Sequence, residues 1–80
     1  MLKRERIINC LDLARYATTR LNELGFNAWR LRHSPIVIFN RPRDEICEKW
    51  QLARQGPIAH LIVTPSVSRE MLDEFLKELD

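Results

Sequence analysis

The chain of 80 residues is poor in the residues that mark several large classes of protein. Its two cysteines, Cys10 and Cys47, are far apart and each lies in a helical pattern, so we expect no disulfide framework and a reducing compartment. No apolar run approaches the ~18 residues of a membrane span, and the start of the chain, MLKRERIINC, lacks the apolar core of a secretory signal. These absences predict a soluble, cytoplasmic protein with no membrane partner.

The net charge is also low, at +2, which is too small to imply a nucleic-acid partner by itself. One local cluster runs against this: Arg30, Arg32, Arg41 and Arg43, with Trp29 nearby. Single-strand binding platforms stack bases on several aromatic side chains, a series that this chain lacks, so solvated or ion-paired arginines are the favoured interpretation. We expect no nucleic-acid partner, and weak nucleic-acid binding stays open as a rival hypothesis.

What the chain does have is the composition of an ordinary globular domain, with 45% hydrophobic and 30% charged residues. A chain of this length buries only about 60–65% of the surface that its unfolded form exposes. We therefore expect residues 1–80 to form a single domain of slight stability.

The spacing of apolar residues predicts a helix near each end of the chain. Residues 4–24 place apolar or small side chains at steps of three and four, and Gly25 suits the left-handed residue that ends a helix. Near the other end, Ser68 is a candidate N-cap, and Val67 and Leu72 have the spacing of a hydrophobic staple. The apolar face of this last helix comprises Leu72, Phe75, Leu76 and Leu79.

A third helix is predicted in the middle of the chain, within residues 40–56. Pro42 suits its start, two acids follow where the helix dipole favours them, and a Gly-Pro pair ends the pattern. Its apolar side comprises Ile46, Trp50 and Ala53, with Cys47 beside them. We expect Trp50 to be a core anchor whose indole N–H has a hydrogen-bond partner.

Strands are predicted at residues 27–32, 36–39 and 58–63, which alternate or are rich in β-branched side chains. A short His-Ser-Pro turn at 33–35 joins the first two, which favours an antiparallel pair. The elements predict an α+β fold: a small, largely antiparallel three-stranded sheet with helices packed on it, in the order α-β-β-α-β-α. The order of the strands within the sheet stays open.

The second and third predicted strands are apolar on both faces. Ile36 and Ile38 point to one side and Val37 and Phe39 to the other, and residues 58–63 alternate in the same way. Because a sheet with one wet face alternates apolar and polar residues, both faces should be covered. So short a chain covers only one face well, so we expect a second copy of the chain or a larger domain on the other. In the alternative, the first helix crosses to the far face and makes three layers.

Few side chains are candidates for chemistry. Cys10, Cys47, His33 and His60 lack the close pairs of zinc sites, so we predict no metal site. Both cysteines lie where small buried hydrophobes are usual, which argues against a cysteine nucleophile. For His60 two interpretations stay open: a core-edge histidine bonded within the chain, or a group that faces the absent neighbour.

Three short stretches carry a resemblance to a known family. They are AWR at 28–30, KWQLA at 49–53 and GPIAH at 56–60. Within a pattern that runs from about Cys10 to the end of the chain, they resemble the C-terminal segment of bacterial pyridoxal-phosphate-dependent histidine decarboxylases, a group II family with the aspartate-aminotransferase type of fold. The sequence departs from the family at Thr64-Pro65-Ser66, where Met-Pro-His is common, and also at Asn40 and Arg43, which leaves another amino acid open as the substrate.

The resemblance implies that the chain is the small C-terminal domain of such an enzyme and packs on a large domain that binds pyridoxal 5'-phosphate. The resemblance also implies that the Schiff-base lysine belongs to that large domain. None of the lysines here has the context expected of it, since Lys3 lies at the start of the chain and Lys49 and Lys77 lie on amphipathic helices. Alone, the chain would bind no cofactor, carry no catalytic residue and have no decarboxylase activity.

The same resemblance suggests which residues lie near the substrate cleft. An arginine of the small domain can bind a substrate carboxylate in relatives of this fold, so Arg30 is a candidate, and His60 is the other. Trp29 and Trp50 are candidate anchors of the core or of the interdomain contact. A rival hypothesis from another class is a free-standing homodimeric module that buries its second sheet face against itself.

Overall fold

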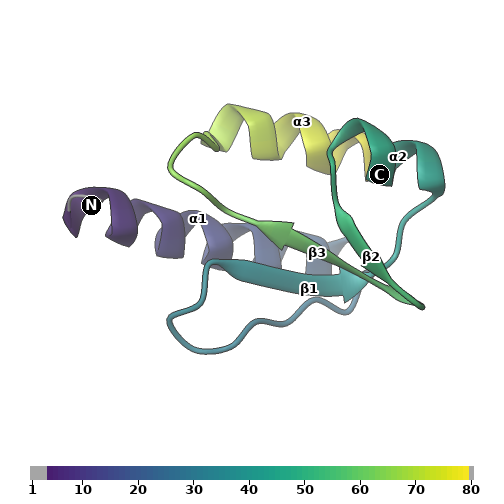
Figure 1. Cartoon of the computed structure of the whole chain (residues 1–80), viewed down its shortest axis with the longest axis horizontal. Coiled ribbons are helices and arrows are strands. Elements are labelled where there is room, and N and C mark those ends of the chain that lie inside the picture. The colour runs from purple at the N-terminus through teal and green to yellow at the C-terminus, as the bar shows by residue number, and fades with distance from the viewer. Residues whose placement is uncertain (1–3, 80) are drawn as a thin grey trace.

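Three helices and three strands follow one another along the computed structural model, which describes residues 4–79 and their side chains from Asn9 onward (Figure 1). They are α1 (Arg4–Glu23), β1 (Ile36–Asn40), α2 (Asp44–Lys49), β2 (Ala53–Gln55), β3 (Ile58–Ile62) and α3 (Arg69–Leu79). The strands form one antiparallel sheet in the order β1-β3-β2, so β3 is central. The predicted α+β class, with a three-stranded antiparallel sheet and three helices, is confirmed.

α1 keeps the predicted end, and its buried stripe shares Ala14 and Leu21 with the predicted one but runs through Cys10 and Ala17 in place of Leu11 and Thr18, which are half-buried. Its buried side chains recur at steps of four, three and four residues: Cys10, Ala14, Ala17 and Leu21. Gly25 has φ +86°, its N–H donates to the carbonyl of Asn22, and the N–H of Phe26 donates to the carbonyl of Leu21. This pair of bonds is a Schellman motif, which satisfies carbonyls that the helix end leaves free.

The first predicted strand, at residues 27–32, is reduced to a single antiparallel bridge. The N–H groups of Trp29 and Ile38 each donate to the other's carbonyl at 2.8 Å. Asn27 and His33 have φ of 51° and 63°, and such left-handed residues interrupt an extended ladder on both sides of the bridge. When this bridge takes the place of the first strand, the elements follow the predicted order, with one further strand, β2, added before β3.

The predicted middle helix is shorter than its pattern indicated, and the sheet gains a strand from its end. α2 stops at Lys49, because Gln51 has φ +53° and the N–H of Leu52 donates to the carbonyl of Cys47 in a second Schellman motif. The chain then forms β2, which sequence analysis did not predict. A two-residue turn at Gly56-Pro57, with glycine at φ +56°, joins β2 to β3.

α3 begins at the predicted cap and buries the predicted face. The Oγ atom of Ser68 accepts a hydrogen bond of 3.2 Å from the N–H of Met71. Leu72, Phe75 and Leu76 are buried. The two members of the predicted staple, Leu72 and Val67, both pack into the core. The cap and the face of this helix are confirmed.

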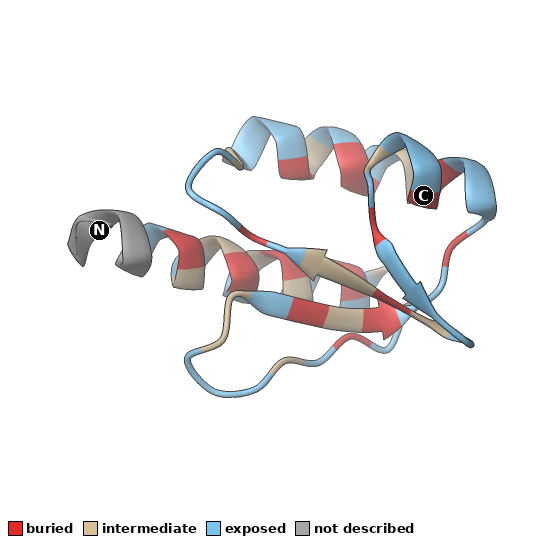
Figure 2. Ribbon diagram, in the orientation of Figure 1, coloured by how far each residue is buried: buried red, intermediate tan, exposed pale blue. Residues whose placement is uncertain are grey.

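Both long helices pack on the same face of the sheet. On that face Val37, Phe39 and Ala59 are almost fully buried in one core with residues of α1 and α3 (Figure 2). The alternative in which the first helix crosses to the far face is therefore wrong. We call this side of the sheet the covered face.

Candidate functional site, the open face of the sheet

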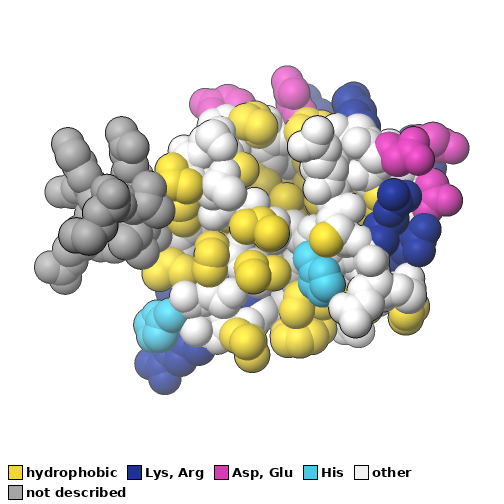
Figure 3. Space-filling view, in the orientation of Figure 1, with side chains coloured by type: hydrophobic (Ala, Val, Ile, Leu, Met, Phe, Trp, Pro, Cys, Tyr) yellow, Lys and Arg dark blue, Asp and Glu magenta, His cyan; other side chains and the backbone are white. Residues whose placement is uncertain are grey.

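The other side of the sheet is apolar and uncovered. Cross-strand partners share a face, so the pairs Ile36–Ile62 and Ile38–His60 and the Trp29–Ile38 bridge bring together five side chains. We call these five residues the open face: Trp29, Ile36, Ile38, His60 and Ile62. Figure 3 shows hydrophobic side chains gathered across the middle of the molecule, with most charged ones at its rim. Trp29 is 50% exposed and Ile62 51%, and adjoining apolar groups of this kind mark an interaction surface.

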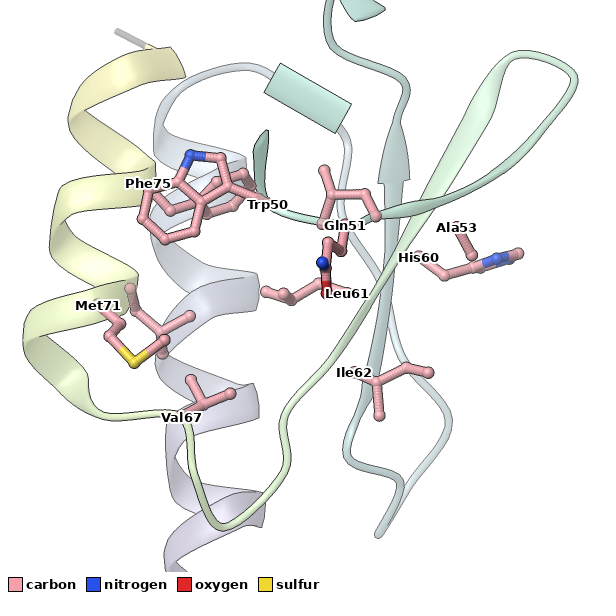
Figure 4. Close-up of a pocket in the computed structure, with 11 residues that line it drawn as sticks. Trp50, Gln51, Ala53, His60, Leu61, Ile62, Val67, Met71 and Phe75 are labelled. Carbon is pink, nitrogen blue, oxygen red and sulfur yellow. The ribbon is translucent and has the colours of Figure 1, made fainter. Parts of the chain in front are cut away.

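His60 is the titratable member of the open face. It lies half-buried between Ile38 of β1 and Ala53 of β2. Its ring points away from the helices, as the close-up shows (Figure 4). This placement is on the side where a neighbour was expected and not within the core, so it favours the second of the two interpretations of this residue.

Arg30 follows the bridge residue Trp29 and is also half-buried. Its Nη1 atom donates to the carbonyl oxygens of Ser34, at 3.3 Å, and of Leu31, at 3.4 Å. These hydrogen bonds connect the guanidinium to the turn before β1. His60 lies in the middle of β3, so the two candidate cleft residues do not form one hydrogen-bonded cluster.

The two tryptophans lie in different surroundings. Trp29 is on the open face, whereas Trp50 is half-buried on the helix side of the sheet. The Trp50 ring meets the ring of Phe75 edge-on, with centroids 5.7 Å apart, and its indole N–H donates to Glu78. The predicted hydrogen-bond partner of Trp50 is thus present, although the ring is less buried than a core anchor.

The arginines that resembled a nucleic-acid platform are mostly engaged with acids or carbonyls. Arg41 bonds to Asp44 at 2.6 Å, and Arg54 lies 3.7 Å from the same carboxylate. Arg43 pairs with Glu45 at 3.2 Å. The hydrogen bond from Arg41, the main cause, and the nearby positive charges hold the pKa of Asp44 below its ordinary value. These contacts leave fewer cations free for phosphates.

Other kinds of site find little support in the described part of the chain. Among residues 4–79, whose side chains are described from Asn9 onward, no group of three or more His, Cys, Asp or Glu side chains could hold a metal ion. Cys10 and Cys47 are both free and buried. None of the helices in this range has the length and apolar character needed to cross a membrane.

Sequence analysis missed a hollow at the edge of the sheet, between β3 and α3. It has a volume of 240 Å³, with Leu61 at its floor, Met71 and Val67 on the α3 side and Trp50 above (Figure 4). We call it the edge hollow. The hollow exists because the left-handed backbone of Gln51 leads the chain away from β3 at this point, so β2 is only three residues long. Glycine is the residue that usually marks a left-handed backbone, and a glutamine does not, so nothing in the sequence indicated the hollow.

Comparisons with known proteins find relatives that are enzymes. No protein-family model matches the chain. The chain is 48% identical over 71 residues to serine decarboxylase 3 of Oryza sativa subsp. japonica, which is 88% of this chain and 16% of that protein. It is 40% identical over 80 residues to the histidine decarboxylase of Pseudomonas fluorescens, which is 94% of this chain and 20% of that protein.

A solved structure is similar in fold as well as in sequence. L-methionine decarboxylase from Streptomyces sp. 590, in its internal aldimine form, matches 94% of this chain with a TM-score of 0.84 and 33% identity. The chain is related to a segment of the amino-acid decarboxylases. The chain spans only 16–20% of the length of the relatives named here. The resemblance to decarboxylases is confirmed, and it extends to serine and methionine decarboxylases as well as to those of histidine.

Proposed function

We propose that the chain is the small C-terminal domain of a pyridoxal-phosphate-dependent amino-acid decarboxylase, and that its open face packs on the large domain of that enzyme. The observation that carries the proposal is the exposure of Trp29, Ile36 and Ile62 side by side, in a segment related to a small part of much longer enzymes. Burial of such apolar surface against a partner removes it from water, and this stabilises the complex. The compartment that we propose is the cytoplasm.

The lysines of the chain do not suit the Schiff base of the cofactor. The ammonium of Lys49 pairs with Glu78 and lies 5.6 Å from the centroid of the Trp50 ring. Lys77 is exposed in the last turn of α3, and Lys3 lies outside the described residues. Pyridoxal 5'-phosphate supplies the electron sink of such a reaction, and we assign its binding to the large domain. In the proposed enzyme this chain therefore supplies no group to the catalytic steps.

Histidine is the first substrate to test, because the three quoted stretches resemble histidine decarboxylases, with serine and methionine as alternatives. We propose that Arg30 and His60 lie near the substrate cleft, and that Trp29 anchors the contact between domains. In the complete enzyme, His60→Gln is expected to raise KM more than it lowers kcat. An unchanged KM in both His60→Gln and Arg30→Lys would place these two residues away from the substrate.

The test of the proposed function begins with the DNA upstream of the Met1 codon. We expect the reading frame to continue into a lysine-bearing large domain. The complete protein, supplied with pyridoxal 5'-phosphate, should release carbon dioxide from histidine, serine or methionine, and the 80-residue chain should release none from any of them. An in-frame stop codon and a ribosome-binding site directly ahead of Met1 would contradict the proposal.

The same open face supports a second candidate, a homodimer that buries this face against its own copy. Sedimentation of the 80-residue chain at several concentrations separates the two. The decarboxylase domain is expected to be monomeric or weakly associating. A tight symmetric dimer, in which the Trp29 fluorescence becomes inaccessible to a soluble quencher, would favour the homodimeric module.

A further inference from the structure

β3 has a free edge beside the edge hollow. The N–H of Val63 donates to the carbonyl of Pro35 at 2.9 Å, which is toward β1. Backbone groups of successive residues in a strand point to opposite sides, so those of Ile62 point away from β1. On that side β2 pairs with the first three residues of β3 and begins only at Ala53, opposite His60. No strand within residues 4–79 pairs with Ile62 there.

The edge is free because the residues that would extend β2 alongside it form the C-terminal end of α2 instead. The register that pairs Ala53 with His60, continued by two residues on each strand, would place Gln51 opposite Ile62. Gln51 instead has φ +53°, and its N–H donates to the carbonyl of Glu48 at 3.4 Å. The N–H and the carbonyl of Ile62 therefore face the edge hollow, without a ladder partner.

The edge hollow suits one large apolar side chain. Its volume is 240 Å³, and none of the residues that line it carries an acidic or a lysine or arginine side chain. A cavity of about 150 Å³ lined by apolar side chains is known to hold benzene. Met71, on the outer wall, is 43% exposed, so the hollow is reached from the surface.

We propose that an extended, uncharged segment of the large domain pairs with Ile62 as an added strand and places one large apolar side chain in the edge hollow. This rests on the proposed function for the source of the segment. Backbone groups of a free strand edge are satisfied best by another extended backbone. Ile62 also joins two surfaces, since its side chain belongs to the open face and its backbone borders the edge hollow. A domain seated on the open face thus reaches the hollow, and the related enzymes have the remaining chain to supply the segment.

The test uses the 80-residue chain, labelled for amide and methyl NMR, and the capped tripeptide acetyl-Val-Leu-Val-amide as the probe. The expected result is a shift of the Met71 methyl and Leu61 methyl signals at millimolar peptide. Hydrogen exchange of the Ile62 amide should slow by roughly two- to tenfold, as for one added ladder hydrogen bond. When the central leucine enters the edge hollow, the backbone groups that face Ile62 belong to the flanking valines, so a peptide that is N-methylated on both valines cannot complete the ladder and should bind more weakly.

Two variants locate the site. Met71→Glu adds a charge at the wall of the edge hollow and should abolish the shift of the Leu61 methyl signals and the slower exchange of the Ile62 amide, and the exposed position of Met71 makes it compatible with folding. Thr19→Glu adds the same charge on the exposed side of α1 and should leave them unchanged. Equal binding of the N-methyl peptide overturns the added strand, and absence of shifts around the hollow overturns the whole proposal.

The remaining outcomes separate this proposal from the one on which it rests. Shifts confined to Trp29 and Ile36 would put the contact on the open face alone, which overturns the added strand and leaves the proposed function standing. Concentration-dependent protection of the Ile62 amide without peptide would make a second copy of the chain the occupant, which also overturns it. An inactive complete protein that still shows the peptide effect would contradict the decarboxylase function and leave the docking edge intact.

Discussion

The two faces of the sheet are made of the same kinds of side chain and lie in different surroundings. In β1, Val37 and Phe39 are 0% and 1% exposed, while Ile36, beside them in the chain, is 38% exposed. The contrast arises from the positions of α1 and α3, which both lie over the covered face. The covered face therefore holds the domain together, and the open face is free to bind something outside it.

The largest expected effect comes from one truncation on the covered face. Phe39 meets both Phe26 and Phe75 edge-on, with centroids 6.4 and 6.1 Å apart. Phe39→Ala should lower the free energy of unfolding by about 3–5 kcal/mol, since it removes a buried ring and leaves a cavity. Urea unfolding followed by circular dichroism measures the change, and Phe39→Leu serves if the alanine variant does not fold.

The matched change on the open face is Ile62→Ala. Because Ile62 is 51% exposed, its truncation should cost at most about 1 kcal/mol. A cost as large as that of Phe39→Ala would show that the open face is packed in the free chain, and the distinction between the two faces would fail.

Trp50 should give an intermediate effect, because it is half-buried at the border of the covered face. Trp50→Ala is expected to cost about 2–3 kcal/mol, below the range of a fully buried tryptophan. Trp50→Phe keeps the contact with Phe75 and loses the N–H bond to Glu78, so it should cost less. If both variants melt at the wild-type temperature, the ring does not support the core.

Local patterns in the sequence were enough to predict much of this arrangement. The steps of three and four in α1, the cap at Ser68 and the left-handed Gly25 each depend on neighbouring residues alone. The open face was also predicted, because the apolar residues of 36–39 alternate onto two sides and the chain has too few helices for both.

The rest depended on tertiary contacts. Residues 50–55 continue a helical pattern, yet β2 is exposed at all three positions and is held by its pairing with β3. Residues 27–32 alternate like a strand, yet the Asn22 side chain bonds both backbone groups of Ala28, and only Trp29 reaches β1. Propensity is a weak guide where pairing decides.

A substitution at Gln51 tests whether a left-handed residue at this position ends α2 and leaves the edge of β3 free. Its expected effect on stability is smaller and is stabilising. A side chain in the left-handed region is strained, so Gln51→Gly should raise the free energy of unfolding by about 0.5–1 kcal/mol, after the extra freedom of glycine in the unfolded chain is counted. Thermal melting measures it, with Gln51→Ala as the control that keeps the strain. Equal melting temperatures for the two variants would mean that the turn after α2 is not left-handed in solution.

The smallest expected effect concerns the polar contact between α2 and α3. Hydrogen bonds from Lys49 and then from the Trp50 indole lower the pKa of the Glu78 carboxyl in the folded chain. Since the folded pKa lies below the unfolded one, this contact stabilises fully above the ordinary pKa of glutamate. The stabilisation is lost as the pH falls through the folded pKa.

Urea unfolding across the acid range should therefore show a steeper loss of stability for the wild type than for Glu78→Gln, which carries no titrating group at this position. Asp44, whose pKa is lowered mainly by its hydrogen bond from Arg41, should keep a smaller acid dependence in the variant, and adding Asp44→Asn should remove that part as well. Ile62→Ala, on the open face, should leave the slope unchanged because it touches neither carboxylate. If Glu78→Gln and the wild type lose stability in parallel, the covered face is held by its apolar contacts alone, and the carboxylate adds nothing to it.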